Sequence, residues 1–335
     1  MDAPNIYQQQ ARNRRATIFI MVLFVLIFCF LGYGFDLFYL GVDPLGILGK
    51  SGFPFPLATI FAFIFSGVTA VWSSQNGAKA ILSSAHAYPV PQNGEQYRVL
   101  MNVVDEMSIA SGLPRPQVYI IPDSDPNAFA TGKDPQHSYI AVTEGLLEKL
   151  NREELQAVIG HEMSHIRNFD IRLMMVVAAL VGGMLLLSDW VRGIMRFGGA
   201  RGGRRSKGGG PLILIVLALW LLTIILAPLI SQLLSMAVSR RREYLADASG
   251  AEMTRNPLAL ASALTKIESA SAPTASIKKG SAHLCIVDPL GLSANSKEGF
   301  WAELFGTHPP ISKRIMLLKS MAYQLHDSRV VGAVS

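Results

Sequence analysis

Residues 151–170 read NREELQAVIGHEMSHIRNFD, and this stretch decides how the rest of the chain is interpreted. Asn151 is followed three positions later by Glu154, a spacing typical of a capping box in the first turn of a helix. The apolar residues that follow recur at helical spacing; they are Leu155, Val158, Ile159 and Ile166. The stretch therefore predicts a helix that begins at Asn151 and packs one face against a core.

Two histidines on this predicted helix, His161 and His165, are four residues apart and lie on the same face. Two imidazoles at that spacing suit two ligands of a tetrahedral zinc ion. Glu162 points away from a metal bound there but reaches a water on that metal, which is the place of a general base. The alternative is a pair of polar histidines on an exposed face, and the apolar flanks disfavour it.

A zinc site that keeps one position open for water needs a third protein ligand. Glu243 is the candidate, in the run Arg-Arg-Arg-Glu-Tyr-Leu-Ala-Asp over 240–247. Asp247 lies four residues on, hence on the same helix face, where it can hydrogen-bond a ligand histidine. The alternative is a charged helix start whose arginines lie at lipid headgroups. The lack of a third histidine near the first two favours Glu243 as the ligand.

Four uncharged stretches are typical of a membrane protein. The chain has 335 residues, of which half are hydrophobic and only 16% are charged. A helix that crosses the hydrocarbon core of a bilayer needs about 20 apolar residues. The stretches at 16–35, 51–78 and 208–239 are long enough, whereas 173–188 is short. A cleaved signal peptide is the alternative for the first stretch, but no small-residue cleavage site follows Phe35.

Cysteine content and charge exclude other classes. Only Cys29 and Cys285 occur, which excludes a disulfide framework or a cysteine-rich zinc cluster. The net charge of +6 clusters beside the apolar stretches, where juxtamembrane basic residues belong. Residues 192–207 are the most basic segment, but they lack the pattern of interleaved aromatic residues that binds nucleic acid. We therefore expect a lipid bilayer, and no nucleic acid, as a partner.

These observations divide the chain into four parts. The expected parts are a membrane hairpin of two helices at 1–78, a first catalytic part at 79–170, a second membrane hairpin with a basic Gly/Arg loop at 171–239, and a second catalytic part with the third ligand at 240–335. Within 79–170, a helix is predicted near 96–111 and strands at 117–121 and 138–142. The expected fold is a mainly α membrane protein with about four transmembrane helices and an α+β zincin catalytic domain carrying a small β-sheet.

Five sequence motifs, taken together, resemble those of the HtpX group of integral-membrane zinc metalloproteases, which are bacterial relatives of the CaaX prenyl endopeptidases. The likeness covers nearly the whole chain and includes the two N-terminal apolar stretches. It rests on His161-Glu-Met-Ser-His-Ile-Arg-Asn-Phe-Asp, Glu243-Tyr-Leu-Ala-Asp, Asn127-Ala-Phe-Ala-Thr-Gly, Ala141-Val-Thr-Glu-Gly-Leu-Leu and Thr307-His-Pro-Pro-Ile-Ser-Lys-Arg.

The resemblance implies a gluzincin-type zinc metalloendopeptidase that degrades misfolded or damaged membrane proteins, or unfolded polypeptides, under envelope stress. It implies one zinc per chain, bound by His161, His165 and Glu243, with Glu162 as the base. The residues expected to support these ligands are Asp247, Asn168, Asp170 and Arg314. The alternative is a CaaX-type prenyl-protein endopeptidase with the same active site, although such enzymes build a larger chamber from more spans.

Two further segments are expected to meet the substrate. Asn127, Ala128, Phe129 and Ala130 predict an edge strand to which an extended peptide adds through main-chain hydrogen bonds; an ordinary structural strand is the alternative. His308 precedes two prolines that suit the start of a helix through Ile311, Ile315 and Leu318. The zinc site otherwise lacks an oxyanion donor, and the resemblance implies a histidine and an arginine of this spacing near the active site, so we expect catalytic His308, and with it Arg314, near the bound substrate. A surface turn whose histidine is solvated is the alternative.

The distribution of charge predicts a cytoplasmic active site, and the resemblance implies that the membrane is the bacterial inner membrane. Arg12, Arg14 and Arg15 precede the first apolar stretch, which places the N-terminus in the cytoplasm. After two crossings the catalytic part returns to that side, close to the membrane surface. The basic loop at 192–207 conflicts with this topology, because a full second hairpin would export it.

Overall fold

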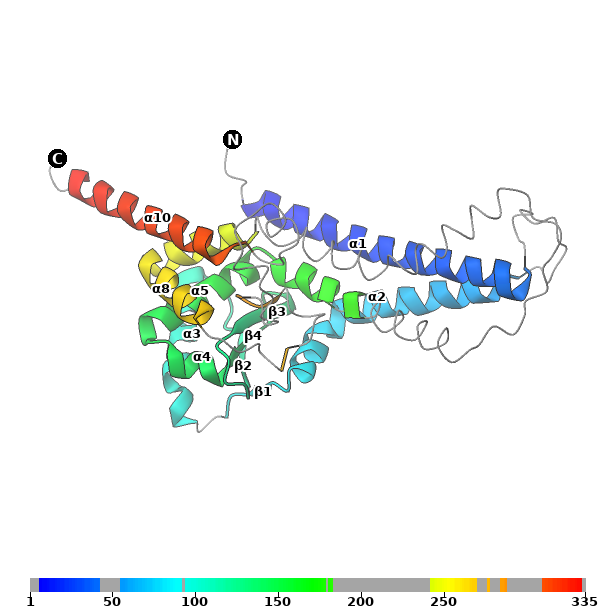
Figure 1. Ribbon diagram of the computed structural model, residues 1–335, viewed down its shortest axis with the longest axis horizontal. Coiled ribbons are helices and arrows are strands. Elements are labelled where there is room, and N and C mark those ends of the chain that lie inside the picture. Colours follow the sequence, from blue (N-terminus) through cyan, green and yellow to red (C-terminus); the bar gives the residue numbers. More distant parts are fainter. Residues whose placement is uncertain are drawn as a thin grey trace.

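The computed structural model describes residues 6–42, 55–91, 94–178, 180–182, 242–269, 276–277, 284–287 and 309–332. A long helical hairpin projects from a mixed α/β body, as Figure 1 shows. The two termini lie at the end of the molecule that carries this body.

The hairpin consists of α1 (Ile6–Phe35) and α2 (Leu57–Ser84), with a short π-helical turn at Asp36–Leu40 after α1. Buried Asp36 joins the two helices at their far end. Its carboxylate accepts hydrogen bonds from the backbone of Ala58 and Thr59, at 2.9 and 2.8 Å, and from the Thr59 hydroxyl at 2.7 Å. These donors belong to the first turn of α2, where N–H groups have no partner within the helix. Asp36 therefore supplies the cap that the sequence before α2 lacks.

Both hairpin helices are long and apolar enough to cross a membrane, over Gln10–Phe38 and Leu57–Ser84. Their outward side chains are large and apolar, such as Phe19, Leu26 and Phe61 at 64%, 60% and 70% exposure. An exposed apolar surface of this extent is typical of contact with lipid. The two N-terminal spans expected from the sequence are present as helices, with α1 starting earlier than 16 and α2 running on past 78.

The second expected hairpin lies largely outside the described residues. Helical residues are described over 170–178 and 180–182, a segment called here the helix over 170–182, and its side chains Leu173, Met175 and Val176 are fully buried. It packs against α2, since a Cβ built on Gly77 would lie 2.9 Å from the Met175 side chain. The apolar stretch at 208–239 and the basic loop at 192–207 belong to the part that the structure does not describe.

A four-stranded mixed sheet forms the centre of the body, in the order β1 (Tyr88–Pro89), β2 (Gln117–Ile121), β4 (His137–Thr143) and β3 (Ala128–Asp134). Strands β2 and β4 are parallel, and the other two pairings are antiparallel. The strands predicted at 117–121 and 138–142 are confirmed as β2 and β4. The segment predicted to be an edge strand forms β3, which ends the sheet.

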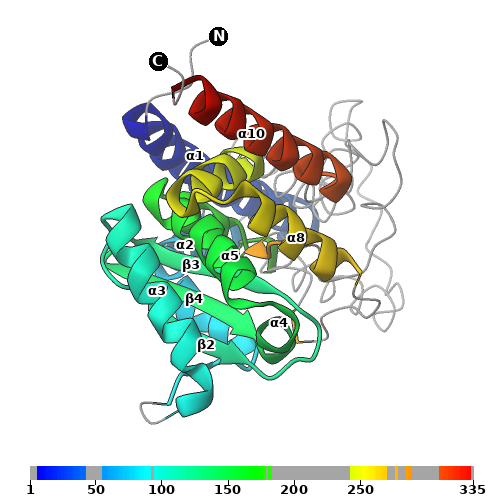
Figure 2. The same ribbon diagram turned by 90° about the vertical axis from the view of Figure 1, so that its left-hand side faces the viewer.

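The sheet separates two cores, because successive residues of a strand point to opposite faces. Ile120, Ala130 and Ile140 face a core shared with helices α3 (Arg98–Ser111), α5 (Arg152–Arg167), α8 (Pro257–Glu268) and α10 (Ile311–Gly332). Phe129 and Ala141 face a second core shared with α1, α2 and the helix over 170–182. Figure 2 shows α3, α5 and α8 lying over the first face. The α1–α2 hairpin is thus built into the far face of the sheet.

Helix α5 begins with the capping box that the sequence predicts. The side chain of Asn151 accepts from the backbone N–H of Glu154, and the carboxylate of Glu154 accepts from the backbone N–H of Asn151, both at 2.9 Å. Glu154 is itself buried and also accepts from Ser262 and Lys266 of α8, at 2.7 Å each. One residue therefore fixes the start of α5 and its packing against α8.

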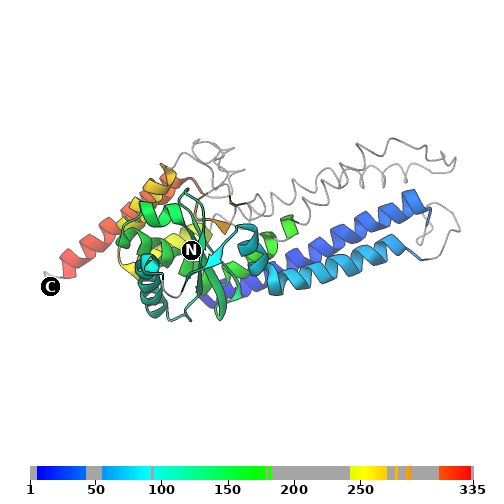
Figure 3. The same ribbon diagram turned by 90° about the horizontal axis from the view of Figure 1, so that it is seen from below.

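Three further described helices belong to the body: α4, a helix over 242–254, and α10. Short helix α4 (Glu144–Lys149) follows β4 directly and is capped by the Thr143 side chain. A helix over 242–254 crosses α5, and α10 follows Pro309 and Pro310 as expected from the sequence. Figure 3 shows how far the α1–α2 hairpin extends beyond this body.

Candidate active site

Helix α5 places His161, Glu162 and His165 in the interior of the body. Their exposed fractions are 0%, 0% and 3%. The two imidazole rings stand nearly perpendicular, with centroids 4.8 Å apart, and their Nε2 atoms are separated by 3.2 Å. A pair of solvated histidines on an exposed face, the alternative from the sequence, is therefore wrong.

Glu243 comes to the same point from the helix over 242–254. Its carboxylate oxygens lie 3.6 Å from Nε2 of His161 and 3.5 Å from Nε2 of His165. Zinc bonds of about 2.0–2.2 Å in a tetrahedron place neighbouring ligand atoms about 3.3–3.5 Å apart. The two Nε2 atoms lie 3.2 Å apart, and each lies 3.5 or 3.6 Å from a different oxygen of Glu243, which is close to that spacing. The three side chains, whose ligand atoms all lie within 4.8 Å of one another, thus fit a single metal ion.

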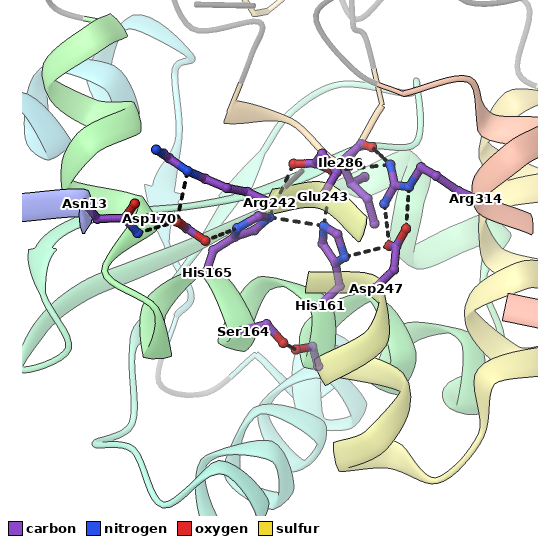
Figure 4. A network of polar contacts seen from close by, with 11 residues as sticks. Asn13, His161, Ser164, His165, Asp170, Arg242, Glu243, Asp247, Ile286 and Arg314 are labelled. Carbon is purple, nitrogen blue, oxygen red and sulfur yellow. Dashed lines mark hydrogen bonds and ion pairs between the residues drawn. The ribbon is translucent and has the colours of Figure 1, made fainter. Parts of the chain in front are cut away.

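The second nitrogen of each histidine faces a carboxylate, as Figure 4 shows. Asp247 Oδ1 lies 3.0 Å from Nδ1 of His161, and Asp170 Oδ2 lies 3.2 Å from Nδ1 of His165. A carboxylate at Nδ1 favours the tautomer that leaves Nε2 free for a metal. The structure thus brings Asp247 and Asp170 to the positions expected of supporting residues.

Arg314 is fully buried and lies behind Asp247 rather than in an open part of the site. It donates from Nε and Nη2 to the two oxygens of Asp247, at 2.8 and 2.7 Å. Its Nη1 donates to the carbonyl of Ile286 at 2.8 Å and lies 3.4 Å from Glu243 Oε2. Arg314 therefore contacts both a candidate ligand and the carboxylate that orients His161.

Burial and charge set the protonation of this cluster. Burial lowers the pKa of His161, but the nearby carboxylates of Asp247 and Glu243 outweigh it and raise that pKa to about 9. The pKa of Asp247 is lowered, because Arg314 and His161 outweigh the effect of burial. The pKa of the Arg314 guanidinium is raised by the same carboxylates. The cluster is therefore a compensated network of opposite charges.

Glu162 differs from the other carboxylates of the site. Neither of its oxygens has a hydrogen-bond partner among the described residues, although the side chain is fully buried. Burial raises its pKa, an effect that the nearby His161 and His165 partly offset. A buried carboxylate with a raised pKa beside a metal site is suited to accept and return a proton.

The outer edge of β3 carries the residues expected to bind substrate. Asn127 is buried and anchors the strand, since its carbonyl accepts from the Thr143 backbone at 3.0 Å. Alternation along the strand then turns the main-chain groups of Ala128 and Ala130 away from β4. The Ala128 carbonyl accepts from the backbone N–H of Ile286 at 3.0 Å, beside an antiparallel bridge between Phe129 and Cys285. Residues 284–287 thus already pair with one end of this edge.

Two other residues were expected near the site, Asn168 and His308, and the structure describes only the first. Asn168 is buried and contributes its main-chain carbonyl, which accepts from Asn13 at 2.9 Å. His308 lies outside the described residues, so its expected place near the substrate stays a prediction.

Three residues that shape the site were missed from the sequence. Asn13 of α1 contacts Asp170, and Gly160 and Gly250 let α5 and the helix over 242–254 cross closely. A glycine within a helical pattern is a signal of close packing and was available in the sequence. Asn13 carries no comparable signal, because it stands among arginines that suit lipid headgroups.

Comparisons with known proteins agree with this geometry. The model of "Peptidase family M48" matches residues 95–322. A "Protease HtpX homolog" from Thermoanaerobacter pseudethanolicus is 43% identical over 322 residues, covering 96% of this chain and 99% of the relative. Another from Ligilactobacillus salivarius is 40% identical and covers 94% of this chain and 100% of the relative. Among solved structures, a crystal structure of S. mikatae Ste24p matches with a TM-score of 0.47 and 19% identity, covering 89% of this chain and 62% of that one.

The matched family segment contains the histidine pair, Glu162 and Glu243, and the similarity to the HtpX proteases extends through the apolar hairpin. Because both the family match and the full-length relatives agree with the buried cluster of candidate ligands, the chain belongs to peptidase family M48 and is a membrane metalloprotease.

Proposed function

We propose that this protein is a zinc-dependent endopeptidase that hydrolyses peptide bonds in misfolded or damaged membrane proteins. One zinc ion per chain is bound by His161, His165 and Glu243. The observation that carries the proposal is that the ligand atoms of these three buried side chains lie within 4.8 Å of one another, beside a buried carboxylate whose oxygens have no hydrogen-bond partner among the described residues.

The residues around the metal position have different roles in the proposed reaction. A zinc ion held by His161, His165 and Glu243 would supply Lewis acidity, which would activate the attacking water and polarise the scissile carbonyl. Glu162 accepts a proton from the attacking water at its carboxylate and returns it to the leaving amine. Asp247 and Asp170 hold the two imidazoles with Nε2 turned inward. Glu162 takes part as a base and not as a ligand, so its loss leaves the metal site intact.

The position of the site suits substrates that are held in a membrane. The body that carries the site packs against the base of the α1–α2 hairpin, and Asn13 of α1 bonds to Asp170 beside His165, which supports a zinc position close to the membrane surface. We place the enzyme in the bacterial inner membrane as a multi-pass protein with a cytoplasmic active site, since Arg12, Arg14 and Arg15 lie near the start of α1, just before its uncharged stretch. A further membrane hairpin at 171–239 completes about four spans. The role that we propose, protein quality control under envelope stress, is the one that the sequence resemblance described above implies.

The full chain in lipid nanodiscs tests the proposal. Purified wild-type protein is expected to hold one zinc and to cleave a misfolded membrane protein faster than the folded form. Glu162→Gln is expected to keep its zinc and lose cleavage. Equal cleavage by Glu162→Gln and wild type would overturn the catalytic assignment. A farnesylated peptide cleaved in preference to misfolded protein would instead favour a prenyl-protein endopeptidase.

A second measurement tests the biological role. Quantitative proteomics of membrane fractions compares cells that carry wild type with cells that carry Glu162→Gln. Substrates of a quality-control protease accumulate in the variant as full-length, misassembled membrane proteins. An unchanged membrane proteome under envelope stress would contradict the role while leaving the peptidase assignment intact.

A further inference from the structure

One residue of the first membrane helix lies inside the active-site network. Asn13 belongs to α1, yet its side chain is only 1% exposed. Its Nδ2 donates to Asp170 Oδ1 at 2.7 Å and to the main-chain carbonyl of Asn168 at 2.9 Å. Figure 4 shows Asn13 reaching Asp170 from the side opposite His165. The contact joins parts of the chain that are 157 residues apart.

The orientation of this amide follows from its neighbours. Both groups that it meets, the Asp170 carboxylate and the Asn168 carbonyl, are acceptors. Only the nitrogen of the Asn13 amide donates, so the opposite orientation would place three oxygens against one another. The hydrogen bond to Asp170 is also charge-assisted, which makes it stronger than a bond between neutral groups.

The two oxygens of the Asp170 carboxylate contact different groups. Oδ1 accepts from Asn13 and lies 3.5 Å from Nε of Arg242, whereas Oδ2 lies 3.2 Å from Nδ1 of His165. Asp170 is fully buried, so no solvent competes for either oxygen. Fixing Oδ1 fixes the plane of the carboxylate, and that plane sets how Oδ2 meets the imidazole.

The turn that carries Asp170 is held by α1 at two further points. Phe169 has a left-handed backbone conformation, with φ of 59°, and the guanidinium of Arg14 lies 5.3 Å from the centroid of its ring. Gln10 donates from Nε2 to the carbonyl of Arg167 at 3.0 Å. Gln10 and Asn13 thus both hold α1 against the turn that carries Asp170. Of these two hydrogen-bond donors, only Asn13 bonds to Asp170 itself.

We propose that Asn13 is a positioning residue of the metal site, through which the first membrane helix orients His165. It acts through Asp170: the amide holds Oδ1, Oδ2 then holds Nδ1 of His165, and Nε2 is directed at the metal. The inference rests on the proposed zinc site. It makes the seating of α1 against the catalytic body a condition for full metal affinity.

Metal binding by the full chain in nanodiscs provides the test, with Gln10→Ala as the matched control. Asn13→Ala is expected to weaken zinc binding by about 10- to 100-fold, the usual effect of removing a partner behind a ligand. Gln10→Ala removes a docking hydrogen bond on the same turn and is expected to stay near wild type. Zinc affinity is measured by competition with a chromogenic chelator, and the visible spectrum of the cobalt-loaded protein reports the ligand geometry independently of activity.

A double variant separates positioning from folding. If Asn13 acts through Asp170, then adding Asn13→Ala to Asp170→Ala produces little further loss of zinc affinity. A full additional loss, or an equal loss in Gln10→Ala and Asn13→Ala, would overturn the inference and leave helix docking as the explanation. Unchanged zinc affinity and cobalt spectrum in Asn13→Ala would also overturn it. Wild type that binds no zinc would overturn the proposed function itself, and this inference with it.

Discussion

Arg314 and Asp247 form a buried, two-point ion pair, with hydrogen bonds of 2.8 and 2.7 Å between helix α10 and the helix that carries Glu243. Asp247 also faces His161, and Arg314 also faces Glu243. The C-terminal helix therefore stabilises the metal site from behind, through one candidate ligand directly and another indirectly.

Removing Arg314 leaves Asp247 and Glu243 without their compensating charge. Loss of one partner of a buried ion pair costs about 3–5 kcal/mol, so Arg314→Ala is expected to lower the free energy of unfolding by that amount. Arg314→Lys keeps the charge but loses the two-point geometry, so its free energy of unfolding is expected to lie between those of wild type and Arg314→Ala. Denaturant titration in detergent measures both, with exposed Lys319→Ala of the same helix as the control. Wild-type stability in Arg314→Ala would show that the pair contributes nothing.

The edge of β3 gives a prediction about substrate. The main-chain groups of Ala130 face away from β4, and its amide favours the ionised form of Glu162. Proline at this position removes an N–H without breaking the β3–β4 ladder. If the amide pairs with an extended substrate, Ala130→Pro raises KM about tenfold or more while zinc content stays normal.

The kinetic pattern distinguishes the roles of this amide. If it serves Glu162 alone, kcat falls and KM is unchanged. Ala128→Pro is a useful comparison, because the Ala128 N–H already donates to the Asn127 side chain at 3.0 Å. Its carbonyl also already accepts from Ile286. Unchanged kcat and KM in a folded Ala130→Pro variant would rule out this edge as a substrate site.

Local patterns in the sequence predicted the parts of the site that depend on local geometry. The capping box at Asn151 and the spacing of His161 and His165 involve residues within one helix, so periodicity alone placed them correctly. The strands β2 and β4 were found for the same reason, from short β-branched runs bounded by turns. Glu243 required the additional argument that a zinc site needs a third ligand.

Contacts between distant segments could not be read in the same way. Nothing local to Asn13 indicates that it reaches Asp170, and nothing local to Cys285 indicates a bridge to Phe129. Both contacts arise from tertiary packing, which brings together segments more than 150 residues apart. The cap that Asp36 provides for α2 is of the same kind, since the donors that its carboxylate accepts from lie 22 and 23 residues further along the chain.

The buried carboxylate of Glu154 makes stability depend on pH. Burial raises its pKa, but hydrogen bonds from Lys266, Ser262 and the Asn151 backbone outweigh that effect, so the pKa lies below its ordinary value. A depressed pKa contributes stability that is present above the unfolded-state pKa of about 4.3 and is lost as pH falls through the folded-state pKa. Glu154→Gln is therefore expected to be less stable than wild type at neutral pH and to lose less stability on acidification. Thermal unfolding from pH 7 to pH 3, with exposed Glu148→Gln as the control, measures the difference; parallel curves for wild type and Glu154→Gln would contradict it.

The crossing of α5 with the helix over 242–254 predicts that metal affinity depends on a glycine. A Cβ built on Gly250 would lie 2.8 Å from the backbone nitrogen of His161 and 3.0 Å from its Cα. Backbone atoms cannot move aside as a flexible side chain can, so Gly250→Ala must push the two helices apart. That displacement separates Glu243 from the histidine pair.

Gly250→Ala is accordingly expected to weaken zinc binding and proteolysis together, and to cost about 1–3 kcal/mol of stability through overpacking. Gly67→Ala is the matched control, because a Cβ on that helical glycine of α2 meets no described atom within 4 Å. Chelator competition measures zinc affinity, and a peptide-cleavage assay at saturating zinc then shows how much activity the metal restores. Since His161 and Glu243 sit on opposite sides of this crossing, zinc in excess should recover part of the lost activity. Wild-type zinc affinity in Gly250→Ala would show that the separation of the two helices does not set the ligand geometry.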